Sequence, residues 1–275
     1  MKNLFSKTLT TILIIIFFTS CEDVIDVKLD KGITKISVDA EITNLPGPYY
    51  VKLTTTAPYF ENKANPPLAG ASVFISDNKG NVDTLIETNN GIYVTQFIQG
   101  EIDVSYTLTI KSGGQEYFAE TKINRVPKID SLYTGFLENE TGFDDGIYVF
   151  TNIQEPEGLG DHFRFRAYRN DTLFNKTSDL FYTSDRFVDG NYIVNQEIAF
   201  NPFLKGDKAT LQILSITEDA YFFYNEVVRQ TSGGGLFSDP PANVRTNVFN
   251  KNPSGTKATG YFFGSAVSQK TIIVQ

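Results

Sequence analysis

Few side chains in this 275-residue chain could carry out nucleophilic or zinc chemistry. The sequence has one histidine, His162, and one cysteine, Cys21. A Ser-His-Asp or Cys-His set needs a histidine beside its nucleophile, and zinc sites draw most of their ligands from histidine and cysteine. Because Cys21 has another expected use, the sequence predicts neither a hydrolase of these types nor a zinc centre. We predict no cofactor and no enzyme activity.

Carboxylates offer a different chemistry, because calcium takes about six to eight oxygen ligands. Glu155, Glu157 and Asp161 lie in one oxygen-rich loop. Asp144 and Asp145 precede that loop by about ten positions. The spacing matches no EF-hand, so a solvated loop is the main interpretation and no metal site is predicted. The five acids are kept as calcium candidates, and no spacing among them singles out a catalytic pair.

A second group of charged side chains lies on a predicted strand. Alternation along the strand places His162, Arg164 and Arg166 on one face. Phe163 and Phe165 fall on the other face, as in an ordinary amphipathic strand. The functional alternative is an anion-binding face at Arg164 and Arg166, because guanidinium groups match the geometry of carboxylates and phosphates.

Two aromatic residues begin a long connection between predicted strands. Tyr59 and Phe60 stand at its start, and Pro66 and Pro67 stand at its end. Long connections in compact domains are often functional or mobile. Tyr59 and Phe60 are therefore candidates for contact with a partner protein. The alternative is that both rings fold back over the end of the domain.

Cys21 follows a segment with the three parts of a secretory signal. Two lysines without any acid come first, residues 9–18 form an apolar region with an unbroken apolar run over 12–18, and two small residues precede the cysteine. The apolar run is shorter than the roughly 20 residues that span a bilayer. We expect residues 1–20 to be a lipoprotein signal peptide and Cys21 to carry diacylglycerol. Ordinary cleavage that leaves a free cysteine is the alternative.

Charge narrows the choice of partners. Residues 1–20 contain two lysines and no acid, so the mature chain would carry 22 basic and 32 acidic side chains. The sequence has no basic run, so nucleic acid is not an expected partner. Anionic lipid head groups would repel an acidic surface. Residues 21–32 are therefore expected to be a lipid-anchored tether that holds the protein off the membrane.

Short alternating segments dominate residues 33–127 and predict strands. The predicted strands cover 33–42, 50–56, 71–76, 82–87, 92–97, 106–111 and 116–123. Turns rich in Asn and Gly between them supply the positive φ angles that tight hairpins need. Seven short strands at this spacing predict an immunoglobulin-like β-sandwich over residues 33–127.

Residues 128–275 are predicted to form a second, β-rich domain with one α-helix, which makes the fold mainly β. The predicted strands cover 129–137, 146–153, 162–169, 180–187, 192–200, 209–216 and 260–267. The helix is expected near 217–230, with Thr217 as N-cap and glycines 233–235 as its end. One stripe of this helix is predicted to pack on the sheet: Ala220, Phe223, Tyr224, Val227 and Val228.

Segments spread over nearly the whole chain carry a family resemblance. They are 21–26 (CEDVID), 38–44 (VDAEITN), 46–49 (PGPY), 56–60 (TAPYF), 69–73 (AGASV), 163–166 (FRFR), 237–244 (FSDPPANV) and 260–263 (GYFF). Together they resemble a large group of Bacteroidota outer-membrane lipoproteins known only by a domain of unknown function. Genes of that group often lie beside TonB-dependent receptors, which implies a partnership with an outer-membrane transporter. The resemblance supplies no catalytic residues.

These observations predict a protein attached by lipid to the outer membrane, on its surface or its periplasmic face. The expected function is accessory or ligand-capturing work, with a TonB-dependent receptor as the partner. The alternative is a structural or adhesive surface module without a small-molecule ligand. A carboxylate-based enzyme is the third hypothesis.

Overall fold

The computed structural model describes residues 33–57, 63–142, 144–199, 201–231 and 243–275. The described part is mainly β, with one α-helix, α2 (Glu218–Thr231), and the predicted fold class is confirmed. Residues 33–275 form one compact unit. Cys21, Tyr59, Phe60 and glycines 233–235 lie outside the described residues, so the structure does not test the predictions made for them.

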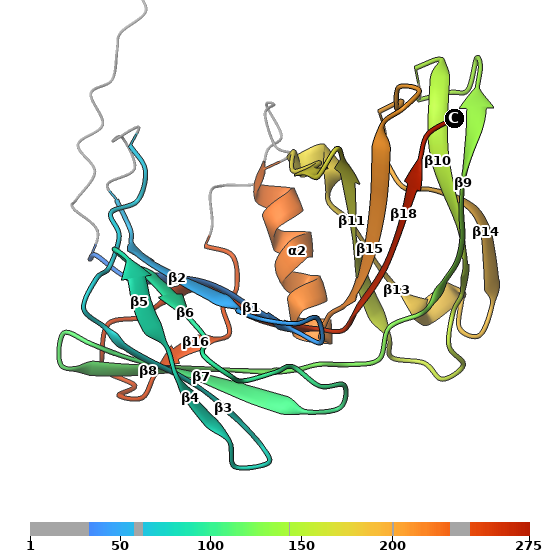
Figure 1. The fold of residues 1–275 in the computed structure, drawn as a ribbon. Coiled ribbons are helices and arrows are strands. Elements are labelled where there is room, and N and C mark those ends of the chain that lie inside the picture. Colours follow the sequence, from blue (N-terminus) through green and yellow to red (C-terminus); the bar gives the residue numbers. More distant parts are fainter. Residues whose placement is uncertain (1–32, 58–62, 143, 200, 232–242) are drawn as a thin grey trace, which may run out of the picture. The chain divides into compact units, whose positions relative to one another are not determined.

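Ten strands form a sandwich of two five-stranded sheets (Figure 1). They are β1 (Ile36–Thr43), β2 (Tyr50–Thr55), β3 (Ser72–Asp77), β4 (Val82–Thr84), β5 (Ile86–Asn89), β6 (Ile92–Val94), β7 (Ser105–Ser112), β8 (Gln115–Lys122), β16 (Val248–Asn250) and β17 (Thr259–Ser265). One sheet has the order β17-β1-β2-β6-β5, and the other has the order β16-β8-β7-β3-β4.

Alternating side chains build the core of this sandwich. Val38, Ala40 and Ile42 of β1 are buried in one sheet, and Leu108 and Ile110 of β7 are buried in the other. All five belong to one apolar cluster. Because successive side chains of a strand point to opposite faces, each sheet contributes one apolar face to a shared core.

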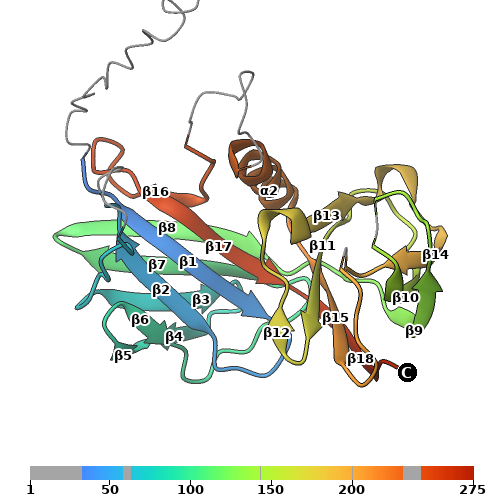
Figure 2. The same cartoon turned by 90° about the horizontal axis from the view of Figure 1, so that it is seen from above.

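Two strands of the sandwich come from far along the chain. β17 pairs in parallel with β1, with Val38 opposite Gly260, and β16 pairs with β8 (Figure 2). Gly260 has φ +90°, and a Cβ at this position would overlap the carbonyl oxygen of Val38. Only glycine allows so close an approach of β17 to β1. The sequence placed the sandwich within residues 33–127, whereas the structure completes it with residues 248–265.

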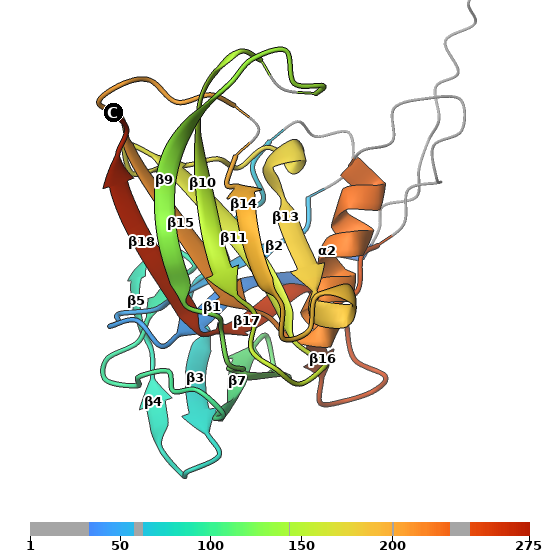
Figure 3. The ribbon, with the colours of Figure 1, turned by 90° about the vertical axis from the view of Figure 1, so that its right-hand side faces the viewer.

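The remaining strands form a second pair of facing sheets (Figure 3). They are β9 (Ile129–Leu137), β10 (Gly146–Gln154), β11 (His162–Arg169), β12 (Thr172–Leu173), β13 (Phe181–Ser184), β14 (Tyr192–Glu197), β15 (Lys208–Ser215) and β18 (Val267–Ile273). One sheet has the order β14-β10-β9. The other has the order β12-β11-β15-β18, and β13 also pairs with β11. Val149 and Ile153 face Phe163, Leu211 and Ile213 in the core between them.

The helix α2 packs beside β11 and β13, and three residues of its predicted stripe, Ala220, Phe223 and Tyr224, belong to the apolar cluster there, whereas Val227 and Val228 are half-buried outside it. The N–H of Ala220 donates to Thr217 Oγ1 at 3.2 Å, which confirms Thr217 as the N-cap. Ala220 and Tyr224 are buried, and Phe223 packs partly buried against the same cluster. In the part of the chain that the structure describes, no helix has the length and apolarity to cross a membrane.

Candidate functional site

A small pocket opens between the two sheets of the second half. Its volume is about 60 Å³. The lining residues come from β11, β13, β14 and the connections beside them: Phe165, Ala167, Phe174, Asp179, Phe181, Gln196, Glu197, Ile198 and Ala199. Phe165 and Phe181 lie in neighbouring strands, with ring centroids 4.7 Å apart. Phe165 is the one lining residue with a sequence signal, as part of the apolar face of its strand, and the sequence predicted no ligand contact for any of the nine.

The lining of the pocket combines apolar walls with a few polar groups. Asp179 and Glu197 supply carboxylates, and Gln196 supplies an amide. Small-molecule sites commonly have this composition, although those for drug-sized ligands measure about 300–1,000 Å³. A pocket of this size suits a short apolar group that carries a cationic or hydrogen-bond-donating end.

Three buried carboxylates form a second candidate site. Glu155, Asp161 and Asp185 have exposed fractions of 2%, 9% and 3%. One carboxylate oxygen of each lies within 4.8 Å of the others. Glu155 follows β10, Asp161 precedes β11 and Asp185 follows β13. The pairing of His162 with Ser184 places the next residue, Asp185, beside Asp161, whose carbonyl oxygen accepts the Asp185 N–H at 3.0 Å.

One oxygen of each carboxylate in this cluster accepts hydrogen bonds. Glu155 Oε2 accepts the N–H of Gly190 at 2.6 Å, and Asp161 Oδ2 accepts Arg125 Nε at 2.8 Å. Asp185 Oδ2 accepts the backbone N–H groups of Gly160 and Asp161 at 2.7 and 2.8 Å. Glu155 Oε1 differs from them, because it is buried and has no hydrogen-bond partner.

Electrostatics in the cluster disfavour three ionised carboxylates. Burial raises the pKa of Glu155, and the charges of Asp161 and Asp185 raise it further. Burial also raises the pKa of Asp161, against the opposing effect of Arg125. Three carboxylates around one guanidinium leave a formal excess of two negative charges. An all-oxygen set of this kind suits a hard cation such as calcium or magnesium rather than zinc.

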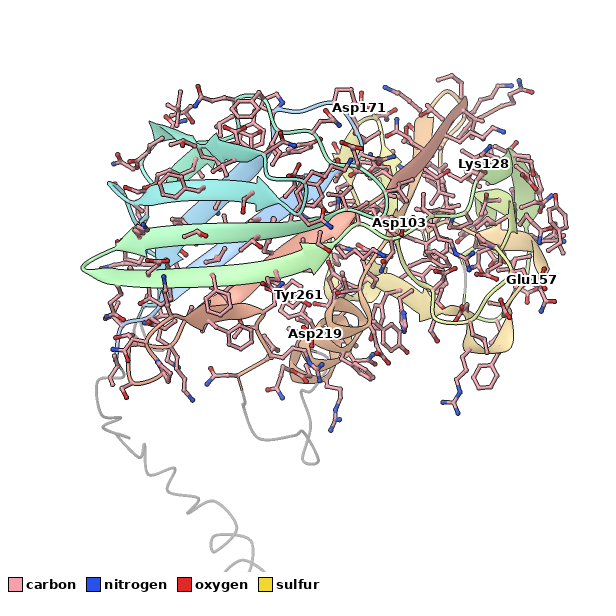
Figure 4. All side chains as sticks on the ribbon, turned by 90° about the horizontal axis from the view of Figure 1, so that it is seen from below. Asp103, Lys128, Glu157, Asp171, Asp219 and Tyr261 are labelled. Atoms are coloured by element: carbon pink, nitrogen blue, oxygen red, sulfur yellow. The ribbon has the colours of Figure 1, made fainter. Side chains whose placement is uncertain are left out.

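The structure brings together only two of the five sequence-predicted calcium candidates. Glu155 and Asp161 share the cluster, to which Asp185 is added. Asp144 and Asp145 lie at the opposite end of β10, which at about 3.3 Å per residue is roughly 30 Å away. Glu157 is exposed on the loop between β10 and β11 (Figure 4).

The two arginines of the predicted anion-binding face make contacts within the protein. Arg166 donates two hydrogen bonds to the Glu41 carboxylate, at 2.9 and 2.8 Å. Arg164 donates to Tyr224 Oη at 2.6 Å, and its guanidinium carbon lies 4.7 Å from the centre of that ring. Anion binding there stays a prediction, and an external anion would have to compete with Glu41 for Arg166.

The pair of Glu41 and Arg166 joins β1 of the sandwich to β11, so its loss should destabilise the protein. We expect Glu41→Gln to lower the free energy of unfolding by about 1–3 kcal/mol, because a mostly buried guanidinium loses its counter-charge. Urea denaturation followed by circular dichroism measures the change. The matched control, Glu101→Gln, breaks an exposed pair with Lys79 and should cost less than about 1 kcal/mol. Equal losses in both variants would contradict the expectation.

A polar network attaches α2 to β17 and to the segment that precedes β16. Tyr261 Oη donates to Asp219 Oδ2 at 2.6 Å, and the two side chains lie together in Figure 4. Arg245 forms ion pairs with Asp219 at 3.0 Å and with Glu226 at 2.9 Å. Burial raises the pKa of Tyr261, which therefore stays a hydrogen-bond donor. This network has a structural role, since it fixes the helix against the strand.

Comparison with known proteins adds one finding that covers most of the chain. A family model described as a domain of unknown function (DUF4249) matches residues 22–271. The matched range includes both the pocket and the carboxylate cluster. No curated protein matches the chain.

Proposed function

The chain belongs to the DUF4249 family, defined by a domain of unknown function, and on that premise we propose that it is a lipid-anchored outer-membrane protein. Its task is to capture a small ligand, as an accessory to a TonB-dependent transporter. The pocket among β11, β13 and β14 is the observation that carries this proposal.

The chemistry of the pocket defines the ligand class. Phe165, Phe181 and Ile198 offer apolar surface, whereas Asp179 and Glu197 offer negative charge. A suitable ligand has a short apolar group, which would be buried against the apolar side chains, and a cationic end, which would pair with a carboxylate. A free amine on a hydrophobic residue, as in a small peptide, is one chemistry of this kind.

The expected anchor sets the reach of such a protein. A diacylated Cys21 would hold the chain stably at a membrane, because two acyl chains bind far more strongly than one. The tether expected at residues 21–32 has 12 residues and, fully extended, reaches at most about 40 Å. A binding module held within this distance suits delivery to a transporter in the same membrane.

Affinity purification tests the proposed partner. The tagged full chain, extracted from native membranes in mild detergent, should bring down a TonB-dependent receptor. Repeated absence of any such receptor would reject the accessory role. A deletion strain that attaches poorly to surfaces but takes up nutrients normally would favour the structural or adhesive alternative instead.

A variant with a blocked pocket distinguishes a protein that captures a ligand from one that only binds the receptor. The half-buried Ala199 lines the pocket, so Ala199→Trp should fill it. We expect this variant to co-purify with the receptor. In a deletion strain, it should restore the uptake of a small hydrophobic peptide at least about tenfold less well than the wild type does. Ala64→Trp places the same ring at an exposed position of the sandwich and should restore uptake fully. If Ala199→Trp restored uptake as well as Ala64→Trp, the pocket would not be the capture site.

A further inference from the structure

One oxygen atom in the carboxylate cluster is left unsatisfied by the protein. Glu155 is 2% exposed, and its Oε2 accepts the Gly190 N–H. Its second oxygen, Oε1, is buried without a hydrogen-bond partner. The two oxygens of a carboxylate share one carbon, so Oε1 lies at the cluster beside Asp161 and Asp185. Buried polar atoms are nearly always paired, so an unpaired carboxylate oxygen at this position requires an explanation.

The charge of the cluster also indicates that a positively charged partner is needed beside these carboxylates. The single ion pair in the cluster, among the residues described, joins Arg125 to Asp161, with Nε and Oδ2 2.8 Å apart. Glu155 and Asp185 accept backbone N–H groups, which carry no formal charge. If all three carboxylates are ionised, two negative charges remain uncompensated in a buried place, where unpaired charges cost the most free energy.

We propose that Glu155, Asp161 and Asp185 bind a calcium ion through their carboxylate oxygens. A divalent cation would neutralise the excess charge and coordinate Glu155 Oε1. Calcium fits better than magnesium because it accepts irregular oxygen cages, whereas magnesium demands near-ideal octahedral geometry and retains its water. Zinc prefers nitrogen and sulfur ligands, which these three residues do not provide.

This site would fasten three separate segments. Glu155 directly follows β10, Asp161 directly precedes β11, and Asp185 belongs to the short 3₁₀ helix η2 (Asp185–Phe187). Arg125, just before β9, reaches the site through Asp161 and also donates to the carbonyl oxygen of Gly158 at 2.7 Å. A bound ion would therefore stabilise the ends of both sheets of the second half. The inference goes beyond ligand capture and does not depend on it.

Calorimetry on the full-length lipoprotein in mild detergent tests the site. After the protein is stripped with a chelator, calcium chloride should bind with one ion per chain. Calcium at about a hundred times its Kd should raise Tm by roughly 5–10 °C. Glu155→Gln keeps the size of the side chain but removes its charge, so it should weaken calcium binding at least about tenfold. The matched control Glu157→Gln changes an exposed acid of the same loop and should leave Kd unchanged.

A second measurement keeps the test valid if Glu155→Gln fails to fold. Terbium, a calcium mimic, should bind the wild-type chain with enhanced luminescence, and calcium should displace it. The proposal is overturned if the wild type shows neither heat of binding nor a Tm shift with calcium. It is equally overturned if folded Glu155→Gln binds calcium as tightly as the wild type, or if magnesium binds as tightly as calcium.

Discussion

Replacing Cys21 with alanine should abolish the incorporation of labelled palmitate into this protein. The chain has one cysteine, so Cys21→Ala removes the only thiol that could form a thioether to diacylglycerol. The expected effect is complete, because no second acceptor thiol exists in the chain. Growth of cells with labelled fatty acid, followed by immunoprecipitation and gel electrophoresis, measures the incorporation.

The neighbouring residue supplies the control for this experiment. Ser20→Ala replaces one small residue with another directly before the cysteine, so its labelling should equal that of the wild type. If the wild type incorporates no label, or if Cys21→Ala still does, the lipid anchor is refuted. A wild-type chain that instead reacts with thiol reagents would show ordinary signal cleavage with a free Cys21.

Phe262→Ala should lower the free energy of unfolding by about 3–5 kcal/mol, a large share of the stability of a typical domain. Phe262 lies in β17, has an exposed fraction of 0% and belongs to the sandwich core. Its partner across the parallel pairing is Ala40 of β1. Truncation would leave a cavity in the core of the sandwich. Urea denaturation, with circular dichroism as the signal, would report the loss as a lower midpoint at unchanged slope.

A phenylalanine of the opposite sheet gives the matched control. Phe249 of β16 is 54% exposed and packs beside Phe118 on the outer face, with ring centroids 6.0 Å apart. Phe249→Ala should cost less than about 1 kcal/mol, since most of this ring already faces water. If Phe262→Ala cost no more than Phe249→Ala, the sandwich would not depend on β17.

Local patterns predicted most elements of this fold. The alternation in 129–137 and 162–169 gave the bounds of β9 and β11 correctly, because each strand has one face in a core. Thr217 correctly predicted the start of α2 for an equally local reason, because its hydroxyl accepts a backbone N–H of the first turn. The pattern merged β17 with the first residue of β18, because both strands are rich in apolar residues and no turn residue separates them. The two-residue β12 and the three-residue β16 are too short to show a period.

The pairing of distant strands had no local signal. Nothing in the sequence of β17 shows that it lies beside β1, although Thr259 and Ile36 are hydrogen-bonded across 223 positions of the chain. The sandwich boundary expected at residue 127 assumed that neighbours in sequence are neighbours in space. That assumption holds for the hairpins of residues 33–127, but it does not hold for the strand that completes the first sheet.

In the candidate sites too, residues close in sequence were predicted, whereas residues brought together by strand pairing were not. Oxygen-rich composition singled out the loop that holds Glu155 and Asp161. Asp185 was missed because it joins them only through the antiparallel pairing of β11 with β13. Had the predicted strands 162–169 and 180–187 been paired as neighbours, Asp185 would have fallen near Asp161. The pocket was missed because its walls come from several strands, none of which is unusual by itself.

The parallel pairing of β1 with β17 also constrains the order in which the protein can be assembled. An exported chain is delivered across the membrane from its N-terminus, so β1 emerges more than 200 residues before the strand that covers one of its edges. During that interval, the edge of β1 that β17 will later cover stays open to hydrogen bonding with other chains. Contacts so distant in sequence also slow folding. We therefore expect nascent copies to need a holding chaperone until residue 265 has been delivered, and partial copies to aggregate.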